Sequence, residues 1–153
     1  MPDSTWIDAP FAYLITIGDN CWFGEECLIL AHDAQMDEFL DAGRIGRVVI
    51  HADCHIGART SILPGVEIGP RTVVAPQSVV LRSLPPDSYC AGNPARVVST
   101  IEELIAKSRE EMQRLPNYDR AAYERLRSSE GGRAELRAAL TNGGYVTGPP
   151  SSQ

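Results

Sequence analysis

The chain has 153 residues, of which 43% are hydrophobic and 22% charged, and its formal net charge at neutral pH is −6. This composition is typical of one folded, soluble domain with at most an appendage, and it excludes a disordered chain. The acidic balance argues against nucleic acid as the main partner. Since no apolar run approaches the roughly 20 residues of a membrane-spanning helix, we expect no membrane span.

The N-terminal sequence MPDSTWIDAP has neither a basic nor an apolar region of the kind found in signal peptides. Four cysteines without such a signal predict reduced thiols and a cytoplasmic location. Residues 1–43 hold acids but no lysine or arginine, whereas arginines outnumber acids over residues 44–99. The basic part could receive a polyanionic cofactor, although accidental asymmetry of a solvated surface explains the charges equally well.

A large apolar residue recurs every six positions over much of residues 11–80. These residues are Phe11, Ile17, Phe23, Ile29, Ile50, Ile56, Ile62, Ile68, Val74 and Val80. Smaller side chains usually stand two positions earlier, and glycine often follows directly. An α-helix would repeat its apolar face every three or four residues instead. The period predicts an all-β, parallel β-helix of about three coils over residues 1–99, with exposed flat faces that favour oligomerisation.

The period is broken once, between Ile29 and Val48, so we expect residues 31–47 to form a loop extruded from the coil. After Pro94 the pattern becomes helical, and Thr100 with Glu103 forms a candidate capping box. We therefore predict a C-terminal α-helical extension over residues 100–142. Residues 143–153 are expected to be a disordered tail.

His32 stands where the regular repeat gives way to the loop, and Asp33 follows it. A neutral imidazole can accept a proton from a hydroxyl group, and a nearby carboxylate can fix its tautomer and stabilise the cation that forms. The alternative is a loop histidine that forms only local hydrogen bonds.

The other two histidines, His51 and His55, raise the question of a metal site. A catalytic zinc site needs about three convergent protein ligands. These two residues occupy different phases of the six-residue coil, and no third histidine lies in phase with them. We therefore expect no metal.

The cysteines are interpreted as structural. Cys21, Cys27 and Cys54 occupy the small inward position of their hexads, where a free thiol behaves as a small apolar group. Cys90 is expected in a loop and is assigned no role.

Two runs carry a family resemblance: ITIGDNCWFGEECLILAHDA, and, after the irregular loop, VVIHADCHIGARTSILPGVEIGPRTVVAPQSVVLRSLPPDSYCAGNPARVV. Over residues 11–99 the chain resembles the hexapeptide-repeat acyltransferases, in particular the galactoside, maltose and capsular-polysaccharide O-acetyltransferases. The resemblance implies a left-handed parallel β-helix and a homotrimer with active sites between its subunits. It also implies acetyl-CoA as the acyl donor, a small-molecule or saccharide acceptor, and His32 as the general base.

The resemblance further implies direct transfer of the acetyl group to a sugar or sugar-like hydroxyl. We expect His32 and the carboxylate that follows it, Asp33, to be the catalytic residues. Gly57, Ala58 and Pro76 would flank the pantetheine arm, while His55 stands where relatives often place a tryptophan. The residues expected to bind the cofactor are His55, Gly57, Ala58, Pro76, Arg82 and Arg96. The two arginines suit the phosphates of CoA, although either could be a solvated surface residue.

The N-terminal segment that shapes the acceptor site in the family is almost absent, since the first predicted hexad contains Phe11. Acceptor recognition therefore falls to the 33–47 loop, through Asp33, Asp37 and Glu38, and to a neighbouring subunit. Two alternatives stay open. One is N-acetylation of an amino sugar, and the other is a non-acyltransferase scaffold, either catalytically silent or similar to the gamma-class carbonic anhydrases.

Overall fold

The computed structural model describes residues 1–148, and the chain divides into two compact units that meet between Leu104 and Ile105. This boundary falls within the predicted C-terminal helical extension of residues 100–142 rather than at its start. Within the described residues, no helix is both long and apolar enough to cross a membrane.

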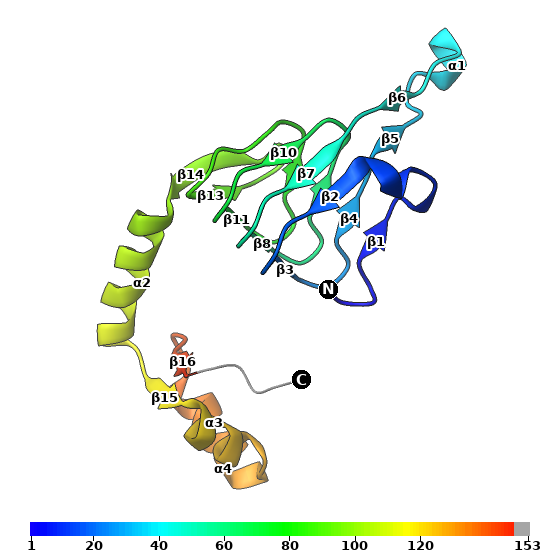
Figure 1. The fold of residues 1–153 in the computed structure, drawn as a ribbon. Helices are drawn as coiled ribbons and strands as arrows, with labels where there is room; N and C mark the ends of the chain where they lie inside the picture. The colour runs from blue at the N-terminus through cyan, green and yellow to red at the C-terminus, as the bar shows by residue number, and fades with distance from the viewer. Residues whose placement is uncertain (149–153) are drawn as a thin grey trace. The chain divides into compact units, whose positions relative to one another are not determined.

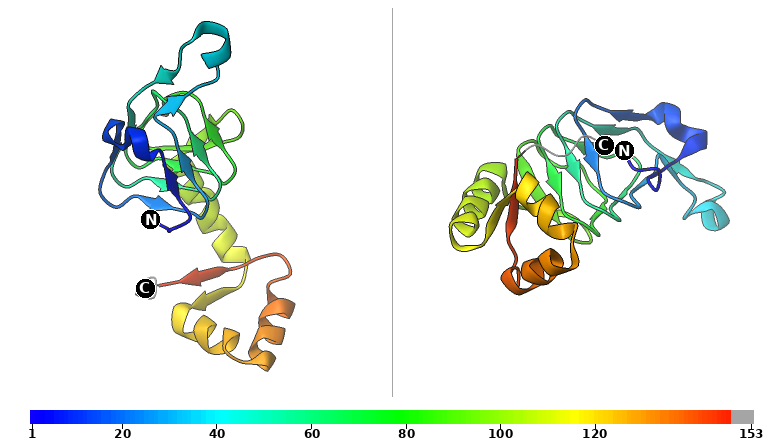
Figure 2. Two further views of the ribbon diagram at one scale, coloured as in Figure 1. Left: turned by 90° about the vertical axis from the view of Figure 1, so that its right-hand side faces the viewer. Right: turned by 90° about the horizontal axis from the view of Figure 1, so that it is seen from below.

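The first unit is a three-sided coil of short strands arranged in three sheets (Figures 1 and 2). The first sheet contains β1 (Trp6–Ile7), β4 (Leu28–Ile29), β9 (Ser61–Ile62) and β12 (Val79–Val80). The second contains β2 (Ile15–Ile17), β7 (Val48–Ile50) and β10 (Glu67–Ile68), and the third contains β3 (Trp22–Phe23), β8 (His55–Ile56), β11 (Val73–Val74), β13 (Ser88–Ala91) and β14 (Arg96–Thr100). Within these sheets, neighbouring strands pair in parallel except β13 with β14. The six-residue period predicts this arrangement.

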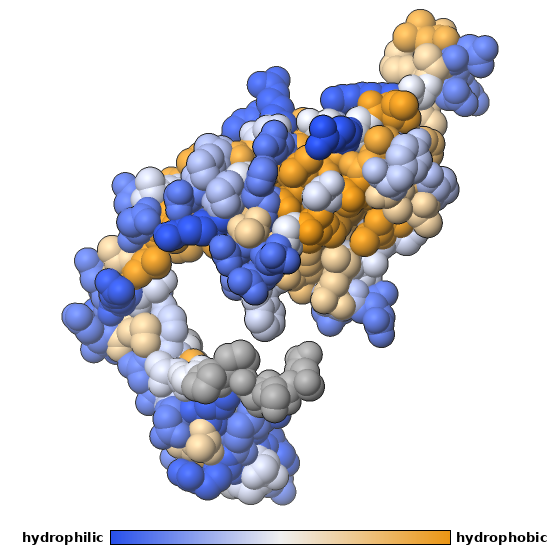
Figure 3. All heavy atoms as spheres, in the orientation of Figure 1, coloured by the Kyte–Doolittle hydropathy of each residue, from blue (hydrophilic) through white to orange (hydrophobic). Residues whose placement is uncertain are grey.

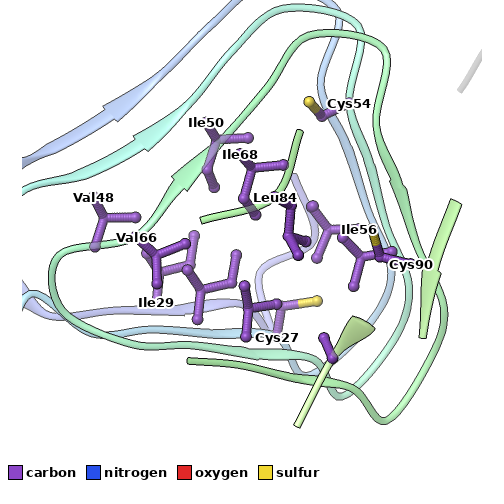
Figure 4. Packing of buried hydrophobic residues seen from close by; sticks show 14 of the residues in the cluster. Cys27, Ile29, Val48, Ile50, Cys54, Ile56, Val66, Ile68, Leu84 and Cys90 are labelled. Carbon is purple, nitrogen blue, oxygen red and sulfur yellow. The ribbon is translucent and has the colours of Figure 1, made fainter. Parts of the chain in front are cut away.

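The apolar residues of the hexads stack above one another inside the coil (Figure 4). In the first sheet Ile62 pairs in register with Ile29 on one side and with Val80 on the other. In the second sheet Ile50 pairs with Ile68 in the same way. Because these side chains are buried, each stabilises the fold by about 1.5–3 kcal/mol relative to an exposed position.

Glycine follows the inward residue at corners where the next coil passes very close. A Cβ added to Gly69 would lie 2.5 Å from the backbone nitrogen of Pro86, and one added to Gly57 would overlap the backbone of Pro76. The recurring glycine therefore reflects contact between the backbones of successive coils.

Two assignments made from the period are wrong. Phe11 lies in a 3₁₀ helix, η1 (Ala9–Leu14), because Pro10 favours the start of a helical turn. The first inward residue is instead Ile7, which pairs with Ile29. Cys90 does not lie in a loop: it belongs to β13, pairs with Val74 and is fully buried.

The break in the period is an antiparallel hairpin of β5 (His32–Asp33) and β6 (Arg44–Ile45) with a short helix at its tip, α1 (Asp37–Leu40) (Figure 1). This agrees with the predicted extruded loop. Helix α2 (Ile101–Arg114) begins at the predicted capping box, where Thr100 and Glu103 each accept a hydrogen bond from the other's backbone N–H.

The second unit contains β15 (Asn117–Asp119), α3 (Arg120–Arg127), α4 (Glu130–Ala139) and β16 (Tyr145–Thr147). Strand β16 corrects the expectation of a disordered tail from residue 143, because it pairs in parallel with β15. The Tyr145 hydroxyl also donates a hydrogen bond to Glu111, 2.8 Å away. Residues 149–153 of the expected tail lie outside the described residues.

Candidate active site

His32 opens β5, at the corner where the chain leaves the first sheet, and its side chain contacts Asp8 from the end of β1. The imidazole Nδ1 lies 2.5 Å from Oδ2 of Asp8. The same oxygen accepts hydrogen bonds from the backbone N–H groups of Ala31, at 3.1 Å, and His32, at 3.0 Å. The Asp8 side chain is fully buried, whereas that of His32 is 38% exposed. Nε2 forms no hydrogen bond with residues 1–148, and only Nδ1 is held by the carboxylate.

The electrostatics of this pair favour an ionised carboxylate. Burial by itself would raise the pKa of Asp8, but the hydrogen bonds from the His32 ring and from the backbone of Ala31 and His32 outweigh it, so that the pKa is lowered. An ionised carboxylate can only accept a hydrogen bond, so the proton of a neutral imidazole stays on Nδ1 and the lone pair lies on Nε2. The arrangement is suited to general-base chemistry at Nε2.

Phe11 contacts the face of the same imidazole. The two rings are stacked, with their centroids 4.4 Å apart and their planes 24° from parallel. The N-terminal segment 6–14 thus contacts His32 at its edge through Asp8 and on its face through Phe11. Although the sequence is expected to lack most of the N-terminal segment that shapes the acceptor site in the family, the short segment that it does have contacts the candidate base.

The carboxylate on His32 is Asp8 and not Asp33. Asp33 pairs across the hairpin with Arg44, and its side chain accepts a hydrogen bond from the backbone N–H of Gln35 at 2.8 Å. Since successive residues of a strand point to opposite faces, Asp33 is directed away from the His32 ring. It lines a groove of about 400 Å³ under the hairpin tip, together with Met36, Leu40 and Arg44.

Sequence reasoning missed Asp8, which lies 24 positions from His32. Its one signal is its place directly after Ile7, which occupies an inward position of the coil. Asp8 can be recognised from its position only if β1, and not a hexad around Phe11, is known to be the first strand of the coil.

A second groove, of about 300 Å³, runs along the outer face of the third sheet. It brings together three of the predicted cofactor residues, His55, Gly57 and Pro76, and its remaining lining includes Trp22, Val73 and Tyr89. The rings of Trp22 and His55 are stacked with centroids 6.2 Å apart. Ala58 follows Gly57 at the corner that leads from the third sheet to the first, and its backbone fills the space beside Gly24.

The predicted cofactor residues therefore lie on two different edges of the coil. Ala58 and Pro76 turn the edge between the third and first sheets, and Arg96, which begins β14, follows the loop at the same edge. Arg82 instead follows β12 and turns the edge between the first and second sheets. His32 leaves the first sheet at that same edge, so the structure groups Arg82 with His32 and separates both from the other predicted positions.

No three histidine, cysteine, aspartate or glutamate residues between positions 1 and 148 are grouped closely enough to hold a metal ion. His51, considered above as a ligand, forms a 2.7 Å contact between its Nε2 and the carboxylate of Glu67. His55 stacks on Trp22.

Comparisons with known proteins agree with this fold. The family model described as bacterial transferase hexapeptide (six repeats) matches residues 47–82. The chain is 39% identical over 97 residues to "Putative acetyltransferase YvoF" of Bacillus subtilis, which covers 63% of this chain and 54% of that protein. It is 45% identical over 56 residues to "Putative acetyltransferase YJL218W" of Saccharomyces cerevisiae, covering 37% of this chain and 29% of that one. The chain thus spans about half, or less, of these curated relatives.

Solved structures of acetyltransferases also resemble the fold of this chain. The hexapeptide-repeat acetyltransferase VCA0836 of Vibrio cholerae, complexed with acetyl coenzyme A, matches with a TM-score of 0.51 and 33% identity over 56% of this chain and 49% of that one. A galactoside acetyltransferase in complex with coenzyme A matches with a TM-score of 0.54 and 26% identity over 60% of this chain and 48% of that one. These neighbours imply that the coil of the first unit is a left-handed β-helix.

Proposed function

The chain resembles the hexapeptide-repeat acyltransferases in its repeat, its sequence and its fold, and we propose that it is an acetyl-CoA-dependent O-acetyltransferase acting on a sugar or sugar-like hydroxyl. One observation carries the proposal: His32 lies at an edge of the coil, its Nδ1 contacts a buried carboxylate, and its Nε2 has no hydrogen-bond partner among residues 1–148. The donor follows from relatives that bind acetyl coenzyme A or coenzyme A.

In the proposed reaction the acceptor hydroxyl donates a hydrogen bond to Nε2 of His32. As the hydroxyl oxygen attacks the thioester carbonyl carbon, its proton moves to Nε2, and the Asp8 carboxylate stabilises the imidazolium that forms. The carbon–sulfur bond then breaks, and the proton passes from Nε2 to the thiolate of CoA. The products are an acetyl ester and the free thiol, and no covalent intermediate forms on the protein.

The predicted site residues lie on two different edges of the coil, and this separation supports an active site between subunits. If a second copy presents its edge with Ala58, Pro76 and Arg96 beside His32 and Arg82 of the first, one donor molecule can contact both groups. Such an assembly would also cover apolar surface, since much of the first unit presents apolar side chains over its strands and at the hairpin tip (Figure 3). Large exposed apolar residues include Trp6, Trp22, Phe39 and Leu40. Contiguous apolar patches of this kind commonly mark protein interfaces. In a homotrimer each copy has two neighbours, so one edge of each copy can face a different edge of the next copy.

Thermal unfolding with and without acetyl-CoA tests the donor site without knowledge of the acceptor. A ligand present at about 100 times its dissociation constant adds about 2.7 kcal/mol to the stability of the folded state. We expect a clear increase in Tm for the natural chain and its loss in the double variant Arg82→Ala, Arg96→Ala. The matched control is Arg71→Ala, an exposed arginine at the third edge that pairs with Asp87, which should keep the shift.

His32→Ala separates binding from chemistry. We expect this variant to keep the acetyl-CoA shift and to lose turnover by roughly 100-fold or more, because general-base catalysis contributes about that much. Unchanged turnover would refute the assigned role of His32. The absence of any acetyl-CoA shift at millimolar concentration would favour a non-acyltransferase scaffold instead.

The acid-rich N-terminal part favours a second candidate, N-acetylation of an amino sugar, since residues 1–43 carry no lysine or arginine to repel a cationic acceptor. Product analysis decides between the two, because mild alkali cleaves an acetyl ester and leaves an acetamide intact.

A further inference from the structure

The burial of Asp8 is unusual for a carboxylate. Aspartate is almost never fully buried unless it is paired, and Asp8 has no exposed surface. Three N–H donors converge on its Oδ2, while Oδ1 is buried without a hydrogen-bond partner in residues 1–148. The carboxylate therefore gives up hydration at both oxygens and recovers hydrogen bonds at only one of them.

A purely structural role does not require this charge. Two of the three donors are backbone N–H groups, of Ala31 and His32, at the point where the chain leaves the regular coil. A neutral amide oxygen would also accept both bonds, less strongly but at a lower desolvation cost. All three donors form stronger hydrogen bonds to a charged acceptor, but only the imidazole of His32 can itself become a cation, so only this donor gains further from the charge during proton transfer.

The contacts also fix the orientation of the imidazole. Its Nδ1 and the backbone N–H of the same residue, His32, share one acceptor oxygen, which restricts rotation of the side chain. Phe11 lies against the ring face with a centroid distance of 4.4 Å. An edge contact and a face contact together hold the ring with Nε2 directed away from Asp8.

We propose that Asp8 is a positioning residue of the active site, which holds His32 as the Nδ1–H tautomer and balances the charge that the ring gains during transfer. This inference rests on the proposed function for its catalytic part. Its structural part, the state of the resting imidazole, is independent of any activity. The proposal assigns the N-terminal segment 6–14 to the catalytic machinery, where Phe11 supports the orientation that Asp8 sets.

Asp8→Asn separates charge from geometry. Because two backbone N–H groups point at the Oδ2 position, the amide oxygen of asparagine must occupy that position, and its NH₂ group must replace Oδ1. The hydrogen bond from Nδ1 is then kept and the charge is lost. Asp8→Ala removes both. The matched control is Glu67→Gln, which changes a carboxylate paired with another histidine, His51, outside the site.

The first measurement is ¹⁵N NMR of the histidine rings in the resting full-length protein. We expect His32 to show a protonated, exchange-protected Nδ1 and an unprotonated Nε2 in the natural chain, in Asp8→Asn and in Glu67→Gln. In Asp8→Ala we expect loss of that single tautomer and of the exchange protection. A natural chain whose His32 carries its proton on Nε2 would overturn the proposal, whether or not the protein turns over acetyl-CoA.

The second measurement is steady-state turnover with an acceptor identified by screening sugars. For Asp8→Asn we expect kcat to fall roughly 10- to 100-fold, part of the contribution of a positioned base, with KM for acetyl-CoA unchanged. Glu67→Gln should keep the natural kcat. If Asp8→Asn lowers Tm but leaves kcat within twofold, Asp8 is structural only and the proposal is wrong. Failure of the proposed function is recognised separately, by the absence of an acetyl-CoA shift in the natural chain.

Discussion

Replacing Gly69 by alanine tests the close stacking of successive coils. The added Cβ would lie 2.5 Å from the nitrogen of Pro86, 2.8 Å from its Cα and 2.9 Å from the carbonyl carbon of Pro85. All three are backbone atoms, so no flexible side chain can move aside, and the two coils must separate locally. Overpacking of this kind costs about 1–3 kcal/mol, and the lower entropy of an unfolded alanine chain offsets at most about 1 kcal/mol.

We therefore expect Gly69→Ala to lower the free energy of unfolding by about 2 kcal/mol, or Tm by about 4–8 °C for a chain of this size. Urea unfolding followed by far-UV circular dichroism, at one fixed protein concentration, measures the change. Gly43→Ala is the control in the same unit, because the Cβ added there would approach its nearest neighbour, the carbonyl oxygen of Asp33, at 3.4 Å. Equal stability of the two variants would refute the explanation of the recurring glycine.

Three further predictions follow from burial and charge. Ile62→Ala should lose about 2–5 kcal/mol in urea unfolding and Ile62→Val only about 1 kcal/mol, because Ile62 is fully buried between neighbours in its sheet; a loss below 1 kcal/mol for alanine would contradict the stacked core. Burial raises the pKa of three thiols, that of Cys54 to about 11, so a thiol reagent at pH 8 should modify Cys21 first in the folded protein and all four thiols only after denaturation. The pKa of Asp8 lies below its ordinary 3.8, so its stabilising contribution is present above that value and is lost as pH falls through the lowered pKa. The difference in unfolding free energy between the natural chain and Asp8→Asn should therefore shrink as pH falls below 3.8, and a constant difference would contradict the ionised state.

The interior of the coil could be predicted from the sequence because its determinants are local. Each hexad supplies one inward aliphatic residue, one smaller residue and one corner, and strands such as β7 and β10 then align Ile50 with Ile68 automatically. The glycine at the corner is required because the backbone of the next coil leaves no room for a Cβ atom. No long-range information is needed to recognise such a pattern.

The ends of the coil were harder to predict because they depend on contacts that periodicity does not encode. Phe11 fits the six-residue phase, yet Pro10 favours a helical turn at that point and leaves Phe11 free to contact His32. Cys90 stacks on Val74 although an irregular stretch precedes it, so only the pairing of β13 with β11 reveals its inward position. Strand β16 likewise forms only because β15 offers an edge.

The candidate base was predictable and its partner was not, for a geometric reason. His32 could be identified from the sequence because the six-residue period is interrupted at its position. Asp8 reaches it only because β1 lies beside β4, which places the residue after Ile7 next to the residues that follow Ile29. The register of the first coil must be known before that neighbour can be named, and the misplaced hexad around Phe11 concealed the register.

The same geometry explains why the predicted cofactor residues do not converge within one chain. In a three-sided coil, positions one hexad apart turn successive edges, and only positions a full turn apart share an edge. Ala58 and Pro76 are about one turn apart and share the edge between the third and first sheets, whereas Arg82 is one further hexad along and turns the next edge, with His32. Under the proposed function we expect the donor to lie between two copies of the coil, with each copy contributing one edge. Loss of the acetyl-CoA shift on dilution to monomers would then accompany loss of turnover, because neither edge alone contains the complete site.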